Sequence, residues 1–308
     1  MRTRIAVLAG LMAIVLTPMS IGAWGMDVHR LITTRAISGL PPALKPYFTE
    51  RSAFITEHSA DPDLWRIVGL RGDLGDEDPN HFLDIDGLDD PRPFANVPRD
   101  WRAYVAKYGV ERANKAGRLP WRTEEIYRLL VARFQDVGKG QPYAAENAAY
   151  LSAVLAHYIE DAHQPFHAVA SYDGQATNQR GIHARFETEL VMRNRLTLKL
   201  TPVTIRPIAN IKDFVFETII DSEALVGTVL AADRAATTGR EFYDDAYYAA
   251  FLKGSRAVLE RRLSESASAA ASAIVAAWTE AGQPKMPLKI GTRAGGALGA
   301  PAPVRIRR

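Results

Sequence analysis

Apolar residues recur at helical spacing along most of this chain, whereas alternating, strand-like patterns are few. The clearest case is residues 144–163, where Leu151, Val154, Leu155 and Tyr158 form one apolar stripe. Pro165 ends that helix, because proline has no backbone N–H and disfavours helical geometry in the residue before it. The same spacing predicts further helices at about residues 28–39, 42–47, 52–58, 101–108, 110–115, 182–193, 211–237, 241–251 and 256–281. Another helix is expected to begin at Thr123, a favourable N-cap residue.

The segments between these helices carry turn and loop signals. Residues 59–101 are expected to be rich in loops, because Asp-Pro pairs and glycines punctuate them. A polar loop is predicted at 168–182, and an extended crossing segment or a short hairpin at 195–209. The expected architecture is all-α, a single mostly helical domain with long loops at residues 24–281. Gly, Pro and Ala dominate residues 282–308, for which we expect a disordered, basic tail.

The first 23 residues have the pattern of a secretory signal peptide. Arg2 and Arg4 precede an apolar run at 5–16, and Ile21-Gly-Ala23 is a plausible site for cleavage between Ala23 and Trp24. The apolar run is too short for a membrane-spanning helix, although an uncleaved anchor is the competing interpretation. We therefore expect a secreted or periplasmic protein whose mature chain begins at Trp24.

Charge and cysteine content narrow the possible chemistry. Of the 38 lysines and arginines, two lie in residues 1–23 and six in residues 282–308, and neither segment contains an acidic residue. The remaining chain has 30 basic and 35 acidic residues, a formal charge of about −5, so it is not a basic nucleic-acid surface by charge alone. Because there is no cysteine, any metal site must use nitrogen and oxygen ligands.

Histidines and carboxylates recur together at helical spacing. His157 and Asp161 are four residues apart on the central predicted helix and therefore share a face. The bend at Pro165 would bring His167 to the same side, and His183 with Glu187 repeats the four-residue spacing. Imidazole and carboxylate groups are typical zinc ligands. This combination predicts a metal centre.

Several motifs together resemble the superfamily that joins bacterial zinc-dependent phospholipase C with the single-strand-specific zinc nucleases of fungi and plants. The motifs are Trp24-Gly-x-x-x-His29, an aspartate ahead of His81-Phe82, His157-x3-Asp161-x5-His167 with its Gln164-Pro165, and His183-x3-Glu187. The resemblance implies a mostly helical domain built around three zinc ions. One ion would be held by Asp63, His81, His157 and Asp161, and a second by His167, His183 and Glu187. The third would take His29, Asp161 as a bridge, and the free amine and carbonyl of Trp24.

Some assignments within this pattern stay open. Asp61 and Asp63 both lie in the segment that should supply the aspartate ligand, and we favour Asp63, because Arg66 follows it three residues later. His163 is expected to hydrogen-bond near the site rather than bind metal, and His58 to lie at the surface. Asp84 and Asp86 would either orient His81 or be solvated.

The resemblance implies hydrolysis of phosphodiester bonds, with a zinc-bound hydroxide attacking phosphorus and Asp63 and Asp161 as the catalytic carboxylates. We favour a phospholipase C-like enzyme acting on a phospholipid head group, because the lack of cysteine, Glu187 and the string Gly181-Ile-His-Ala-Arg-Phe-Glu187 look more like the phospholipases. The alternative is a single-strand-specific endonuclease acting on nucleic acid, which the five-residue spacing from Trp24 to His29 resembles. No obligate protein partner is evident. Residues 88–143 look like an insertion, and their aromatic residues could stack on bases, meet lipid or belong to the core. A secreted zinc-binding protein without catalytic activity is the alternative from another class.

Overall fold

Helices form nearly all of the regular structure in the computed structural model, which describes residues 24–68 and 76–287. No β-strand occurs in those residues, so the predicted all-α, single-domain architecture is confirmed for them. The α-helices are α1 (Met26–Ser38), α2 (Lys45–Glu50), α3 (Ser52–His58), α4 (Asp61–Val68), α5 (Trp101–Tyr108), α6 (Val110–Ala116), α7 (Leu119–Gly138), α8 (Ala144–Ala162), α9 (Ile182–Ala184), α10 (Leu190–Asn194), α11 (Ile211–Glu223), α12 (Val226–Thr237) and α13 (Asp245–Glu280). Short 3-10 turns are η1 (Asp78–Asn80), η2 (Ile85–Leu88), η3 (Pro165–Ala168) and η4 (Gln175–Thr177), and η5 (Arg185–Glu189) is a π-helical turn.

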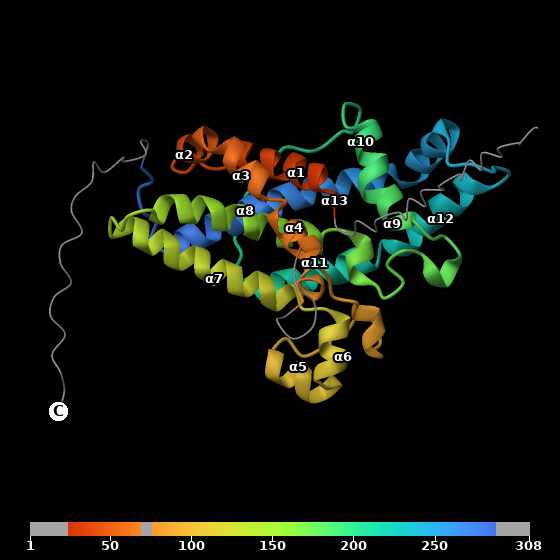
Figure 1. Cartoon of the computed structure of the whole chain (residues 1–308), viewed down its shortest axis with the longest axis horizontal. Coiled ribbons are helices and arrows are strands. Elements are labelled where there is room, and N and C mark those ends of the chain that lie inside the picture. The colour runs from red at the N-terminus through yellow and green to blue at the C-terminus, as the bar shows by residue number, and fades with distance from the viewer. Residues whose placement is uncertain (1–23, 69–75, 288–308) are drawn as a thin grey trace, which may run out of the picture.

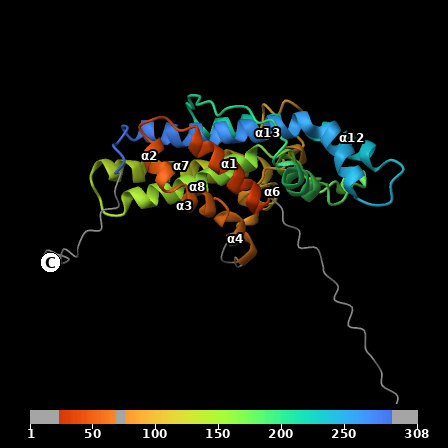
Figure 2. The same ribbon diagram turned by 90° about the horizontal axis from the view of Figure 1, so that it is seen from above.

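Helix α8 is the centre of the fold. It packs against α1, α3, α7, α11 and α13, and every residue from Ser152 to Ala162 is buried. The long helices α7, α8 and α13 run side by side along the long axis of the molecule in both views (Figures 1 and 2). A helix that is covered on all sides can carry charged side chains only where buried partners meet them. His157, Glu160 and Asp161 lie in this fully buried half.

The alanine- and serine-rich part of α13 is a packing helix. Its alanines at 269–271 and 273 join the main core, and its serines face the extended segment 195–209. Backbone N–H groups of Lys199, Thr201, Thr204 and Arg206 donate to Glu260, Ser264, Ser268 and Ser272, respectively, at 2.8–3.2 Å. The four acceptors are spaced four residues apart, so they form one row along the helix. This side-chain ladder replaces the strand pairing of the hairpin alternative.

Helix α13 is continuous where two helices were predicted. The sequence suggested a break near Gly254, but that glycine lies inside Asp245–Glu280. A Cβ atom at Gly254 would stand 2.8 Å from the Cβ of Ala232 on α12. The glycine therefore permits close approach of two helices rather than ending one.

Three other predicted boundaries were wrong. Helix α4 lies in the region expected to be loop, because Pro62 sits in a first turn, where its missing N–H costs nothing. Helix α7 begins at Leu119, and Thr123 lies inside it, donating its hydroxyl to Leu119 O at 2.8 Å. The helix predicted at 211–237 is divided into α11 and α12 at Ala224 and Leu225.

Residues 88–143 contain the whole of α5, α6 and α7, and α5 and α6 project as a lobe from the long helices (Figure 1). Their aromatic residues divide into two groups. Phe94 and Tyr104 are buried in the core, whereas Trp101, Tyr108 and Trp121 are only partly buried. Phe94 and Tyr104 are therefore core residues, as one of the alternatives predicted. The other three aromatic side chains keep exposed surface that a ligand could contact.

The described fold begins at Trp24 and ends at residue 287. The predicted signal peptide and residues 288–308 lie outside the described residues. The described fold extends past the predicted boundary at 281, since Trp278 Nε1 donates to Pro284 O at 2.9 Å and Met286 is buried. Among the helices of the described ranges, none has the length and apolar character needed to cross a membrane.

Candidate metal centre

Segments far apart in the sequence bring the predicted ligands to one side of α8. Helix α8 supplies His157 and Asp161, α1 supplies His29 and α4 supplies Asp63. His81 follows η1 directly, His167 lies in η3, His183 in α9 and Glu187 in η5. All of these side chains are buried. Their nitrogen and oxygen atoms form three groups within which all atoms lie no more than 4.8 Å apart: His29–His157–Asp161, Asp63–His81–His157 and His167–His183–Glu187.

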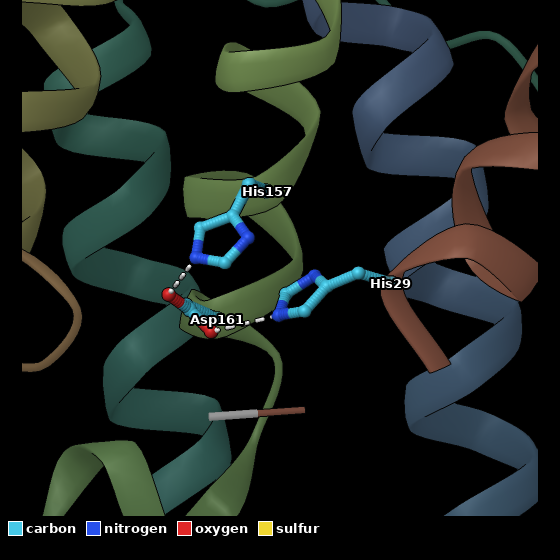
Figure 3. Close-up of side chains that lie close together, drawn as sticks. All are labelled: His29, His157 and Asp161. Carbon is cyan, nitrogen blue, oxygen red and sulfur yellow. Dashed lines mark ion pairs between the residues drawn. The ribbon is translucent and has the colours of Figure 1, made fainter. Parts of the chain in front are cut away.

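Asp161 is the hub of the centre. Its Oδ2 lies 2.9 Å from His81 Nδ1 and 3.1 Å from His157 Nε2. Its Oδ1 lies 3.5 Å from His29 Nε2 and 3.4 Å from His167 Nδ1. Figure 3 shows His29 reaching from α1 toward the same carboxylate that His157 approaches from α8. One carboxylate thus faces four imidazole rings, and its two oxygens can serve different metal ions.

The group at Asp63 links α4 to the hub. Asp63 Oδ1 lies 3.8 Å from His81 Nδ1, which in turn lies 3.0 Å from His157 Nε2. The Arg66 guanidinium stands 3.1 Å from the same Asp63 oxygen. Asp61, the alternative aspartate, points elsewhere and pairs with His58 Nδ1 at 2.8 Å. The structure therefore brings Asp63, not Asp61, to the candidate metal centre.

Hydrogen bonds at the far ring nitrogens orient two of the histidines. His29 Nδ1 lies 2.6 Å from Glu160 Oε2, and His157 Nδ1 lies 2.8 Å from the backbone oxygen of Ser59. Because both acceptors are oxygens, each Nδ1 is assigned the proton, which leaves the Nε2 lone pair directed at Asp161. Such an oxygen acceptor behind a histidine is the usual support of a metal ligand.

Glu160, for which the sequence predicted no role, lies where α8, α1 and the segment at Trp24 meet. Its Oε1 accepts a hydrogen bond from the Thr33 hydroxyl at 2.8 Å, and its backbone oxygen accepts from Trp24 Nε1 at 2.8 Å. The available signal was an acid inside an apolar helix, three residues from His157. Trp24 is fully buried beside this junction, so the predicted mature start of the chain is anchored next to His29. The metal-binding role of its amine stays a prediction.

The group at Glu187 depends on the π-helical turn. His183 Nε2 lies 2.9 Å from Glu187 Oε2, and Gln164 Nε2 donates to the same oxygen at 2.8 Å. Arg185, in the turn between them, is held by a buried clamp: its Nη2 lies 3.2 Å from Asp233 Oδ1, and its Nε donates to Tyr247 OH at 3.0 Å. The Tyr247 hydroxyl also bonds Asp233, which accepts from Gln179 as well. The clamp fixes the widened turn that carries Glu187 against α12 and α13.

Burial dominates the electrostatics of the centre. It raises the pKa of Asp63 to about 7 and raises the pKa values of Asp161, Glu160 and Glu187, while it lowers those of His29, His81 and His167. Arg66 is the cation among the described residues that lies against these acids. Buried carboxylates need opposite charge, and a divalent cation supplies it.

Atoms without hydrogen-bond partners test the fit to a metal. Among the described residues they include His29 Nε2, His81 Nε2, Asp63 Oδ2, Asp161 Oδ1, His167 Nδ1, His183 Nδ1 and Glu187 Oε1. Asp63 Oδ1 and His183 Nε2 likewise make no hydrogen bond of normal geometry, although each lies within ion-pair distance of Arg66 and Glu187, respectively. Buried polar atoms are nearly always satisfied in folded proteins, so such a concentration needs an explanation. These atoms belong to the predicted ligands and lie together, whereas the other unpartnered buried atoms of the described residues are scattered over Arg35, Tyr47, Arg51, Tyr104, Arg118, Arg262 and Ser266. Imidazole and carboxylate donors suit a divalent metal such as zinc.

Four other positions that the sequence singled out, His58, Asp84, Asp86 and His163, lie outside the three groups. His163 bonds its own helix through Ile159 O at 2.7 Å, and burial lowers its pKa to about 3. His58 is partly exposed against Asp61. Asp86 accepts from the Ala170 N–H at 2.8 Å rather than from His81, and burial raises the pKa of Asp84 to about 7.

No protein-family model matches the chain, and no curated protein with which it was compared is a match.

Proposed function

We propose that this protein is a secreted zinc-dependent hydrolase of phosphodiester bonds. The observation that carries the proposal is Asp161, whose two oxygens face four histidines from separate segments, beside buried ligand atoms that lack partners. This arrangement suits neighbouring divalent ions that share a carboxylate. The resemblance in sequence motifs supplies the reaction class, the identity of the metal and the count of three ions.

Bound zinc would act as a Lewis acid that neutralises charge on phosphoryl oxygens and makes water acidic enough to attack near neutral pH. The protein's own groups prepare the site for this role. Glu160 and Ser59 fix the tautomers of His29 and His157, and Gln164 orients Glu187. Burial within the core keeps the imidazoles neutral, which is the form that binds metal.

Trp24 would complete the third site after signal-peptide cleavage. Its indole is hydrogen-bonded to Glu160 O, one residue before Asp161, so its backbone start is held close to His29. A free amine at this position would be a nitrogen donor that an internal amide cannot be. Secretion and ligand formation would then be linked steps.

Turnover of bis(p-nitrophenyl) phosphate tests the proposal. We expect hydrolysis that a chelator abolishes and added zinc restores, together with about three zinc ions per chain by elemental analysis. Asp161→Asn, which keeps the shape of the side chain, should lose both zinc and turnover. Zinc binding without turnover of this diester, of phosphatidylcholine or of single-stranded nucleic acid would instead support a non-catalytic zinc-binding protein.

A further inference from the structure

A pocket of about 270 Å³ lies between the segment that precedes α9, the C-terminal half of α12 and the connection from α12 to α13. Helix α12 and the start of α13 form one end of the long axis of the molecule in both views (Figures 1 and 2). None of the lining residues is a predicted metal ligand. The volume is just below the range of roughly 300–1,000 Å³ that is usual for drug-sized ligands, so the pocket suits a ligand of one or two small rings.

The floor of the pocket is polar and is already held in place by the protein. Asp233 and Gln179 line it, and both are more than nine-tenths buried. Gln179 Nε2 donates to Asp233 Oδ2 at 2.7 Å and to Leu230 O at 2.8 Å, while Asp233 Oδ1 lies 3.2 Å from Arg185 Nη2. Gln179 Oε1 has only a long contact, 3.4 Å from Arg234 Nη2, and can accept a better hydrogen bond. A ligand would therefore meet an ordered floor with one buried acceptor to spare.

Three more polar side chains of the lining have hydrogen-bonding capacity for a ligand. Arg240 donates from Nη1 to Ala236 O at 2.7 Å, and its other N–H groups have no partner among the described residues. The side chains of Asn178 and Glu241 make no hydrogen bond or ion pair within the same part of the chain. Guanidinium, amide and carboxylate groups are planar and together supply both donors and acceptors. Neighbouring hydroxyl groups suit such a set, because each hydroxyl donates one hydrogen bond and accepts others.

The formal charges around the pocket balance. The carboxylate of Asp233 is paired with the Arg185 guanidinium at 3.2 Å, and Arg240 directly precedes Glu241 in the chain. A cationic ligand would meet the charge of Arg240, and an anionic ligand would meet that of Glu241. An uncharged polar ligand avoids both repulsions.

Two aromatic side chains stand beside these polar groups. Phe242 is 74% exposed and Tyr243 is 51% exposed, and both line the pocket. Tyr243 is partly covered, because the Arg185 guanidinium lies 4.1 Å from its ring centroid and the Tyr247 ring lies 4.7 Å away. Phe242 has no ring contact with the described residues, so both of its faces are free. Adjacent exposed aromatic rings at the edge of a pocket are typical of a binding surface.

From these features we infer that the pocket binds one or two units of an uncharged saccharide. A pyranose ring has apolar C–H faces and hydroxyl groups around its edge. One face would pack on Phe242, and the hydroxyls would bond Asn178, Arg240 and Glu241. The inference does not rest on the proposed hydrolysis, since the pocket contains no predicted metal ligand. Such a site would hold the protein on a glycan-bearing surface while the metal centre stays free.

The test is binding of four uncharged trisaccharides to the zinc-loaded protein: maltotriose, cellotriose, mannotriose and triacetylchitotriose. Saturation-transfer NMR detects binding, and calorimetry then gives the affinity. We expect at least one trisaccharide to bind. Phe242→Ala should weaken that binding about tenfold, whereas Phe242→Trp should retain it, because a flat ring is what the sugar face requires. Glu241→Ala should also weaken binding about tenfold, through loss of hydrogen bonds to a charged acceptor.

Leu196→Ala is the matched control, since Leu196 is 91% exposed and does not line the pocket. It should bind the trisaccharide as the wild type does. Because Phe242 and Glu241 are exposed, their variants should keep the wild-type melting temperature and zinc content. The affinity should also persist after chelator treatment.

Three results would overturn the inference. The first is that none of the four trisaccharides binds. The second is wild-type affinity in folded Phe242→Ala and Glu241→Ala, above all if the binding disappears with the zinc, which would locate the sugar at the metal centre. The third is binding of tetramethylammonium but of no trisaccharide, with loss of that binding in Glu241→Gln, which would identify a cation site.

Discussion

The contact between Glu160 and His29 predicts that Glu160→Gln has different effects on the zinc-loaded and the metal-free protein. Replacing Glu160 by Gln keeps the shape of the side chain but removes the charge that lies 2.6 Å from His29 Nδ1. In the zinc-loaded protein this should weaken binding of the ion that His29 and Asp161 would share, because a ligating histidine loses its supporting carboxylate. Changes of this kind typically lower metal affinity by 10–100-fold, which corresponds to about 1.4–2.7 kcal/mol.

In the chelator-treated protein the same substitution should not destabilise the fold. Burial raises the pKa of Glu160 well above its usual range, so the ionised carboxylate disfavours the folded state when no cation is near. Removing an acid with a raised pKa therefore leaves the unfolding free energy of the metal-free chain unchanged or increases it above pH 5. The zinc-loaded and metal-free proteins should thus respond differently to one substitution.

The assay is a zinc titration against a competing chelator, with urea unfolding of both forms. Glu57→Gln is the matched control, because Glu57 is exposed and pairs with Arg30 on α1 without contacting a ligand. We expect the control to change neither affinity nor stability by more than about 1 kcal/mol. Wild-type zinc affinity in Glu160→Gln, or equal destabilisation of both forms, would refute the role given to Glu160.

Three other predictions follow from the same structure. A chain with one extra residue ahead of Trp24 should lose one zinc ion by elemental analysis, because the donor amine becomes an amide; full zinc content would remove the amine from the ligand set. Asp233→Ala should lower the unfolding free energy by about 3–5 kcal/mol in urea titrations, because it leaves the buried Arg185 without its carboxylate, and it should reduce zinc content at Glu187; wild-type values would show that the clamp is dispensable. For His163, whose pKa burial lowers to about 3, the unfolded state binds a proton below its ordinary value of about 6.5 while the folded state does not. The unfolding free energy of metal-free protein should therefore fall as the pH drops from 6.5 toward 3, and less so in His163→Asn; parallel pH profiles in urea titrations would contradict the assignment.

The sequence predicted which candidate ligands lie together better than it predicted the helix boundaries around them. Spacing of four on a helix determines which side chains share a face, so His157 and Asp161 could be placed together from the chain alone. The contact of Gly254 with Ala232 could not, because a glycine that ends a helix and one that admits a neighbour look alike in sequence. The role of Glu160 could not be predicted either, because its partners His29 and Thr33 lie on α1, more than a hundred residues away in the sequence.

The burial of the aromatic residues in 88–143 could not be predicted from the sequence either. The aromatic residues of 88–143 were visible in the sequence, but not which of them the core would take. Tyr104 is fully buried against Trp121, while Trp101 and Trp121 keep part of their surface exposed. Only tertiary packing makes that division.

The ladder between the crossing segment and α13 has a consequence for how the molecule would behave in deuterated solvent. The amides at 199, 201, 204 and 206 belong to no helix or sheet, yet each has a side-chain oxygen as its acceptor. Their exchange would be slowed only while the segment lies on α13, so these four positions would act as built-in reporters of that docking. The amide hydrogens of this segment, which has no regular secondary structure, would then exchange as slowly as those of the core.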